Sequence, residues 1–209
     1  MNTDNIYNSA LFSLYSQLII GIICFYGVFI QLEPQDKILN SILWMETIVQ
    51  FIEFIFYYWL IKNIQSINYD ITYIRYFDWF LTTPTMLISI IVFMLYTTSN
   101  DILNFVETLN ENNTNIWYVI FFNALMLFFG FLGEKRIISK NMAFLGGTLF
   151  FILSFKIIYD NYVNNNETNK IIFYMNFIVW SFYGLAFLLS YSNKNVMYNI
   201  LDIFIYQIL

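Results

Sequence analysis

The chain has 209 residues, of which 59% are hydrophobic, 22% aromatic and only 11% charged. This composition excludes an ordinary soluble domain and is typical of an integral membrane protein. The net charge is −5, the sequence contains no histidine, and its single cysteine is Cys24. Without a basic patch, a cluster of metal ligands or a catalytic triad, the sequence argues against a nucleic-acid partner, a metal site and an enzyme.

Apolar stretches of about 20 residues recur along the chain, each long enough to cross roughly 30 Å of hydrocarbon as a helix. In chain order they are Ile6–Leu32, Ile38–Ile61, Ile71–Thr97, Ile116–Gly133, Met142–Val163 and Ile171–Tyr191, followed by a short seventh span, Asn195–Leu209. The polar breaks are short apart from Ser99–Asn115 and Asn161–Lys170. This spacing predicts one helical membrane domain over residues 1–209.

The third span contains polar residues that are costly inside a bilayer. Arg or Asp at the centre of an inserting helix costs about 2.5–3.5 kcal/mol, so such residues usually face the bundle interior. Arg75, Asp78 and Thr82 fall on one helix face, and Pro84 follows two residues later. Either Arg75 and Asp78 pair to hold the bundle together, or Asp78 is the counter-ion of a buried cation that Arg75 tunes. We favour the counter-ion.

Polar stripes continue on two further spans. Glu46 and Glu53 lie two turns apart on one face of the second span, with Tyr57 one turn beyond. The seventh span carries Asn195, Asn199 and Asp202 at the same helical spacing. Glu46 reaching the headgroups, and the seventh-span stripe acting only as interhelical hydrogen bonds, are the alternatives. Acidic residues on three helices favour a buried cation or a cation path.

The segment RYFDWFLTTP, Arg75–Pro84, resembles the third-helix signature of microbial (type 1) rhodopsins. These are seven-helix membrane proteins that hold all-trans retinal as a protonated Schiff base on a lysine. WSFYG, Trp180–Gly184, resembles their sixth helix, and MLFFG, Met126–Gly130, resembles their fourth. The resemblance covers nearly the whole chain, with the fifth span contributing least. It implies an all-α membrane protein with the seven-transmembrane-helix rhodopsin bundle.

The resemblance also implies roles for individual residues. Asp78 corresponds to the Schiff-base counter-ion, Asp202 to a second counter-ion and Arg75 to their partner. The implied retinal pocket consists of Tyr76, Trp79, Thr82, Thr83, Met126, Gly130, Trp180, Tyr183 and Phe187.

One position departs from the family pattern. The family's retinal lysine lies four residues after the seventh-helix aspartate, and that position is Tyr206 here. The resemblance therefore implies retinal bound covalently to a seventh-helix lysine that these 209 residues do not contain.

Other positions indicate the subgroup. Ser89 stands where proton pumps carry their cytoplasmic carboxylate donor, and Lys194 where they carry the release carboxylate. KNVMYNILD, Lys194–Asp202, resembles the first group of viral rhodopsins, light-gated cation channels of large algal viruses. Glu46 and Glu53 resemble second-helix glutamates of channelrhodopsins. The implied ion pathway consists of Ser13, Glu46, Glu53, Asn195 and Asn199.

The expected function is therefore that of a retinal-binding photoreceptor acting as a light-gated cation channel. A light-driven outward proton pump and a non-ionic photosensor are the alternatives. The expected partners are the lipid bilayer and cations, with a homo-oligomer left open. The expected location is a multi-pass position in a membrane, which for a viral protein is a membrane of the host cell.

Overall fold

The computed structural model describes residues 3–66 and 70–205, and this part of the chain is helical without any strand. Six helices in it are long and apolar enough to cross a membrane. The α-helices are α1 (Thr3–Val28), α2 (Lys37–Asn63), α3 (Arg75–Thr98), α4 (Phe105–Glu111), α5 (Asn113–Glu134), α6 (Lys140–Ile158), α7 (Glu167–Phe187) and α8 (Tyr191–Ile205). Short helical turns cover Pro34–Asp36, Thr72–Ile74 and Tyr159–Val163. The chain is thus an all-α, multi-pass membrane protein.

Polar residues in the breaks cap the N-termini of several of these helices. The side chain of Asn104 accepts hydrogen bonds from the first backbone amides of α4, and Ser139 and Asn166 do the same for α6 and α7. Such caps satisfy amides that have no partner within the helix. The break Ser99–Asn115, predicted from its polarity, therefore contains a short helix of its own.

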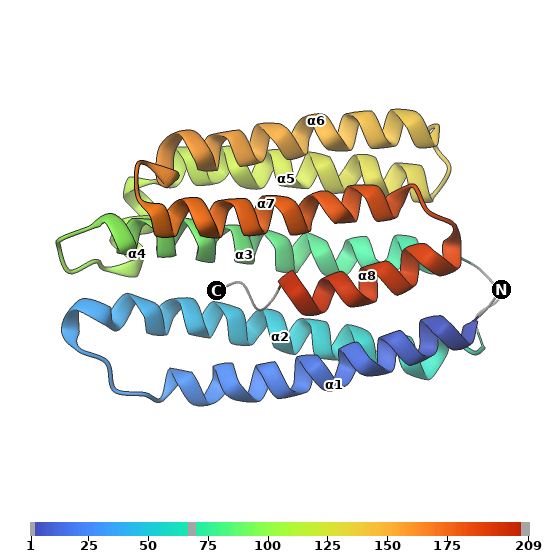
Figure 1. Cartoon of the computed structure of the whole chain (residues 1–209), viewed down its shortest axis with the longest axis horizontal. Coiled ribbons are helices and arrows are strands. Elements are labelled where there is room, and N and C mark those ends of the chain that lie inside the picture. Colours follow the sequence, from blue (N-terminus) through green and yellow to red (C-terminus); the bar gives the residue numbers. More distant parts are fainter. Residues whose placement is uncertain (1–2, 67–69, 206–209) are drawn as a thin grey trace.

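The long helices pack side by side as one bundle, with α5 and α6 on one side and α1 and α2 on the other (Figure 1). Between these pairs lie α3, α7 and α8, and α3 packs against α2, α5 and α7. Of the six spanning helices, α3 has the most buried apolar window. The helix with the costly polar residues therefore lies at the centre of the bundle.

The seventh span differs from its predicted bounds. Tyr191, which the apolar pattern placed at the end of the sixth span, begins α8 instead, because α7 ends at Phe187. The 15 residues of α8 cover about 22 Å, less than the hydrocarbon core. In Figure 1 the helix ends about halfway along its neighbours. Residues 206–209, including Tyr206, lie outside the described part of the chain.

A buried ion pair fastens the start of α8 to the end of α5. Lys194 Nζ lies 2.7 and 2.8 Å from the two carboxylate oxygens of Glu134, with the two side chains 8% and 5% exposed. The pair lines a polar cleft of about 540 Å³ together with Arg136 and Lys140. Lys194, which the resemblance aligns with the release carboxylate of proton pumps, therefore forms a buried ion pair with Glu134.

Glu134→Gln is expected to lower the free energy of unfolding by about 2 kcal/mol, because Lys194 keeps one neutral acceptor in place of a carboxylate. Reversible unfolding in mixed detergent micelles, followed by circular dichroism, measures this loss. The matched control is Glu167→Gln, since Glu167 is 82% exposed in its pair with Lys170 and is expected to contribute less than about 1 kcal/mol. Equal losses for the two variants would contradict the assignment of a buried pair.

Candidate functional site

A cavity of about 320 Å³ lies among α3, α5, α6, α7 and α8. Its volume is at the lower end of the range for small-molecule sites, and its lining is mostly apolar. Every residue of the predicted retinal pocket lines this cavity except Thr82. Thr82 is fully buried on α3, where its hydroxyl donates to the Asp78 carbonyl oxygen at 3.2 Å. The spacing of residues on α3, α5 and α7 thus brings eight of the predicted residues to one place.

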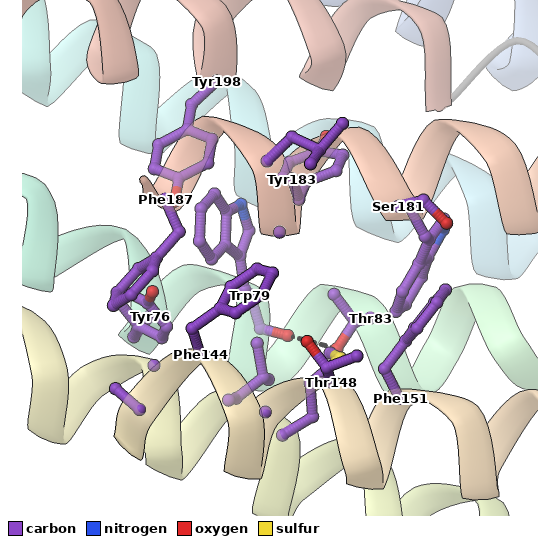
Figure 2. Close-up of a pocket in the computed structure, with 18 of the residues that line it drawn as sticks. Tyr76, Trp79, Thr83, Phe144, Thr148, Phe151, Ser181, Tyr183, Phe187 and Tyr198 are labelled. Carbon is purple, nitrogen blue, oxygen red and sulfur yellow. Dashed lines mark hydrogen bonds between the residues drawn. The ribbon is translucent and has the colours of Figure 1, made fainter. Parts of the chain in front are cut away.

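Aromatic rings form one wall of the cavity. Trp79 makes edge-to-face contacts with Tyr76, Tyr183 and Tyr198, at ring-centroid distances of 5.1, 5.5 and 4.9 Å. Figure 2 shows Tyr76, Phe187 and Tyr198 near one end of the cavity, and Thr83, Phe151 and Ser181 near the other. Such edge-to-face pairs hold their rings more firmly than area burial alone does. The cavity therefore has a rigid aromatic frame that suits a long, flat, apolar ligand.

The sequence analysis did not identify the residues of α6 that line the cavity. Phe144, Gly147, Thr148 and Phe151 all line the cavity. Their spacing of three, four and seven residues is that of one helix face, which was the signal available in the fifth span. Tyr198 was also missed, although it precedes Asp202 by one turn and shares its face.

A fully buried polar cluster lies beside the cavity, centred on Arg75 and Asp202. Arg75 Nη1 lies 3.4 Å from Asp202 Oδ2, and both side chains are 1% exposed. The hydroxyl of Tyr57 donates to the same carboxylate, and Tyr183 donates to its other oxygen at 2.7 Å. Arg75 therefore forms its ion pair with Asp202 of α8. The alternative in which Arg75 pairs with Asp78 of its own helix is wrong.

Ser13, Asn195 and Asn199 belong to the same cluster. Arg75 donates to the side-chain oxygens of Asn195, at 3.2 Å, and of Asn199. Ser13 donates to the Asn199 carbonyl oxygen at 2.6 Å, which ties α1 to α8. Three residues of the predicted ion pathway thus lie in a closed hydrogen-bond network around Arg75.

Asp78 lies on α3 about one turn after Arg75 and is 7% exposed. Neither of its carboxylate oxygens has a hydrogen-bond partner of normal geometry in the described part of the chain. Its acidic neighbours are Glu53, whose side chain is within hydrogen-bonding reach, and Asp202. The nearby guanidinium of Arg75 forms its ion pair with Asp202. Asp78 can therefore interact, as a carboxylate or as a carboxylic acid, with a ligand that lies beside it.

The polar stripe of α2 continues from there along the bundle. Glu46, Gln50, Glu53 and Tyr57 are all buried, at the spacing of one helix face. Glu46 is 7% exposed, so the alternative in which it reaches the headgroups is wrong. Both polar atoms of the Gln50 amide lack a hydrogen-bond partner among the described residues.

A hydrogen bond next to Pro84 joins α3 to α5. Asn123 Nδ2 donates to Thr83 Oγ1 at 2.7 Å, and Thr83 Oγ1 donates to the Trp79 carbonyl oxygen at 2.7 Å. The sequence analysis did not single out Asn123. A lone amide in an apolar span was the signal that could have found it.

Retinal, the cofactor that the resemblance implies, fits the cavity in one respect and not in another. The aromatic slot suits a polyene, and Gly130 leaves room beside Tyr76, since a Cβ there would lie 2.5 Å from the Tyr76 ring. However, no lysine lines the cavity in the described part of the chain, and the last described lining residue is Ile205. The residues present thus fit the apolar body of retinal but not its attachment to a lysine.

Comparisons with known proteins place the chain in a family. The model of the family described as bacteriorhodopsin-like protein matches residues 8–209. No curated protein sequence matches the chain significantly.

Solved structures share the fold. Viral rhodopsin OLPVRII is similar over 96% of this chain and 91% of its own, with 26% identity and a TM-score of 0.86. A proton-pumping rhodopsin from the marine alga Acetabularia acetabulum is 19% identical with a TM-score of 0.75, over 98% of this chain and 90% of its own. Xanthorhodopsin, described as a light-driven ion pump with dual chromophore, is 16% identical with a TM-score of 0.75, and the match covers 99% of this chain and 92% of its own. At these identities the last two show the fold alone.

The family match and the viral structure confirm the resemblance to microbial rhodopsins, and to viral ones among them, whereas the assignment to their first group stays a prediction. The family is one of photoreceptors and ion transporters, and it is not an enzyme family. The aromatic cavity and the Arg75–Asp202 cluster agree with the family match over residues 8–209. The chain therefore belongs to the bacteriorhodopsin-like proteins, the microbial rhodopsins.

Proposed function

We propose that this protein is a retinal-binding photoreceptor that conducts cations through the membrane when illuminated. The observation that carries the proposal is the buried stripe of Glu46, Gln50 and Glu53 on α2, which faces the interior of a bundle in a membrane. Polar side chains at such depth are expensive and mark ion or proton pathways.

Unsatisfied polar atoms extend this stripe to the neighbouring helices. Gln17 Oε1 on α1, the Gln50 amide on α2 and Ser89 Oγ on α3 have no hydrogen-bond partner within the described residues. These side chains are each no more than 1% exposed. Buried polar groups normally bind protein atoms or ordered water, so the interface of α1, α2 and α3 is expected to hold water. A line of water beside carboxylates is what a permeating cation needs.

The charges on this route favour cations over anions. Glu46, Glu53 and Asp78 supply acidic groups, whereas the guanidinium of Arg75 is held by Asp202 and two asparagines. Acidic side chains along a pore select for cations. The residues of the Arg75 cluster, Ser13, Asn195 and Asn199, are proposed to close the route in the dark.

Retinal would be held between the rings of Trp79, Trp180, Tyr183 and Phe187, with Asp78 as the proposed counter-ion and the Asp202–Arg75 pair behind it. Retinal supplies, when bound, the light-driven change of shape. Attachment to a seventh-helix lysine, which the family implies, finds no described lysine at the cavity. Conduction depends on the chain's own polar residues.

An outward proton pump is the main competitor, with Asp78 as the proton acceptor. Two observations favour the channel over it. Ser89, at the position of the pumps' donor carboxylate, is fully buried and has no carboxyl group. Lys194, at the position of the release carboxylate, is bound to Glu134 at 2.7 Å.

Whole-cell voltage clamp under illumination, with all-trans retinal supplied, tests the proposal. A channel gives photocurrents that reverse sign with voltage and follow the cation gradient. Current of one sign at every voltage would instead identify a pump. A visible absorption band without any photocurrent would identify a non-ionic photosensor, and either result overturns the channel.

Glu53→Gln is expected to lower the cation photocurrent about tenfold, equivalent to about 1.4 kcal/mol, because it removes a carboxylate from the route while keeping the side chain's size. Glu33→Gln is the matched control, since Glu33 is exposed before α2 and is expected to leave the current unchanged. Surface expression of both variants, measured by labelling, separates conduction from folding. Equal currents from the two variants at equal expression would exclude Glu53 from the route.

A further inference from the structure

The break between α5 and α6 is basic. Its residues, Lys135–Lys140, include three cations and no acidic side chain. Figure 1 shows this break at the same end of the bundle as the connection between α7 and α8. The break at the opposite end of α5, Ser99–Asn115, contains three acidic residues and no cation. The two ends of α5 therefore differ in the sign of their charge, and anions are attracted to the end that adjoins α6.

The polar cleft of about 540 Å³ lies between this break and the start of α8. Its charged lining residues are three cations and two acids: Arg136, Lys140, Lys194, Asp70 and Glu134. Glu134 is bound to Lys194 at 2.7 Å, and Asp70 Oδ1 accepts from the Thr72 backbone amide at 2.8 Å. Within residues 3–66 and 70–205, neither Arg136 nor Lys140 forms an ion pair with an acid. The cleft therefore contains positive charge that the protein does not neutralise.

Hydrogen-bond donors remain available on the wall of the cleft. Lys140 Nζ donates to the carbonyl oxygens of Leu188 at 2.8 Å and Leu189 at 3.5 Å, which leaves one of its three N–H groups. The guanidinium of Arg136 has no hydrogen-bond partner among the residues that the structure describes. Donors of this kind without acceptors suit an anion that carries several oxygen atoms.

The backbone holds Arg136 in a conformation that arginine rarely adopts. Its φ is 57°, in the left-handed region. The amide of Arg136 donates to the Gly133 carbonyl oxygen at 3.0 Å, and that of Ile137 donates to the Leu132 carbonyl oxygen at 2.9 Å. Helices that end in this pattern usually have glycine at the left-handed position. A side chain there strains the backbone, and such strain gathers at functional sites. The fold alone would thus favour glycine at position 136.

Exposed apolar side chains adjoin the cleft at the ends of membrane-spanning helices. Ile137 lines the cleft and is 66% exposed. Leu188 and Leu189, whose carbonyl oxygens hold Lys140, are 43% and 42% exposed. Both α5 and α7 are long and apolar enough to cross a membrane. Cations beside lipid-facing apolar side chains match the phosphate and the acyl chains of a phospholipid.

We propose that the cleft binds the phosphate group of a phospholipid, with the guanidinium of Arg136 and the remaining N–H group of Lys140 as its donors. A guanidinium donates to two phosphate oxygens at once, and an ammonium can contact a third. Anionic phospholipids are preferred, because their phosphate charge is not neutralised by a cation within the headgroup. Phe187 is the one residue that lines both this cleft and the aromatic cavity, so binding here requires no retinal.

Native mass spectrometry of the full-length chain, titrated in a non-ionic detergent with short-chain phosphatidylglycerol, tests this proposal. Saturable binding is expected, at least about tenfold tighter than that of phosphatidylcholine with the same acyl chains. Inorganic phosphate is the third probe and is expected to bind at least about tenfold more weakly than phosphatidylglycerol, because it lacks acyl chains. Equal affinity for the two lipids overturns recognition by charge. Inorganic phosphate that binds as tightly as phosphatidylglycerol overturns the lipid as the occupant, and a lack of saturable binding overturns the site.

Two variants of neighbouring residues separate the cleft from a general attraction to the basic break. Arg136→Gln is expected to weaken phosphatidylglycerol binding about tenfold. Lys135→Gln is the matched control, since Lys135 Nζ lies 3.4 Å from the centre of the Tyr73 ring and Lys135 does not line the cleft. It removes the same charge and is expected to change the affinity less than about twofold. Equal losses in the two variants overturn the cleft as the binding site.

A third variant separates binding from folding. Arg136→Gly removes the strained side chain, so it is expected to be at least as stable in thermal unfolding as the unmodified chain. The same variant is expected to weaken phosphatidylglycerol binding about tenfold. Unchanged affinity in Arg136→Gly overturns the role of the guanidinium, and a lowered thermal midpoint would show that Arg136 serves the fold instead.

Discussion

Arg75→Gln is expected to lower the free energy of unfolding by about 3–5 kcal/mol, the cost of leaving one member of a buried ion pair uncompensated. Arg75 and Asp202 are both 1% exposed, so water cannot replace the lost guanidinium without opening the bundle. The guanidinium also donates to Asn195 and Asn199 and lies 5.3 Å from the centre of the Phe56 ring. Reversible unfolding in mixed micelles measures the loss.

A double variant separates the charge from the contacts. Arg75→Gln with Asp202→Asn removes both charges and keeps one acceptor oxygen for the hydroxyl of either Tyr57 or Tyr183, while the other hydroxyl can accept from the new amide group. It is expected to be more stable than Arg75→Gln alone, because no unpaired buried charge remains. Lys156→Gln is the control, since its pair with Asp160 is 64% and 49% exposed and contributes less than about 1 kcal/mol. A loss for Arg75→Gln as small as that of Lys156→Gln would show that the cluster does not hold the bundle together.

The partner of Arg75 illustrates what a sequence can and cannot predict. Helical spacing correctly placed Arg75, Asp78 and Thr82 on one buried face of α3. It could not say which neighbouring helix supplies each contact, because that depends on how the bundle packs. Asp78 is close in sequence, yet the ion pair forms with Asp202, 127 residues away.

The cavity lining also shows what the sequence could and could not predict. On α3, α5 and α7 the ordered motifs identified lining residues that the structure brings together. On α6 the lining face consists of Ala, Gly, Phe and Thr residues, which are common in any membrane helix, so the sequence analysis did not distinguish it. Gln17 and Gln50 were also overlooked, since an amide carries no charge, although their burial without partners distinguishes them in three dimensions.

Two glycines of the cavity are expected to respond in opposite ways to the same substitution. Gly130→Ala puts a Cβ 2.5 Å from Cε1 and 2.6 Å from Oη of Tyr76, too close for any real contact. The Tyr76 ring cannot simply turn away, because it packs on Trp79 at 5.1 Å and on Phe131 at 6.3 Å. Overpacking of this kind typically costs about 1–3 kcal/mol. Either α5 moves away from α3 or the ring enters the cavity.

Gly147→Ala makes the same chemical change on α6, where the cavity lining has no such conflict. Its nearest neighbour would be the Met126 carbonyl oxygen at 3.6 Å, an ordinary contact. Alanine is also favoured over glycine within a helix by up to about 1 kcal/mol. This variant is therefore expected to be at least as stable as the unmodified chain and to bind retinoid almost as well.

Retinoid titration followed by quenching of tryptophan fluorescence compares the two variants, because Trp79 and Trp180 both line the cavity. Gly130→Ala is expected to weaken binding at least about tenfold, equivalent to about 1.4 kcal/mol, and to lower the thermal midpoint. A general effect of adding a methyl group to the cavity wall predicts the same loss for both glycines. Only the close approach of Gly130 to Tyr76 predicts that the loss appears in one and not in the other, so equal affinities would place the ligand elsewhere than against the Tyr76 wall.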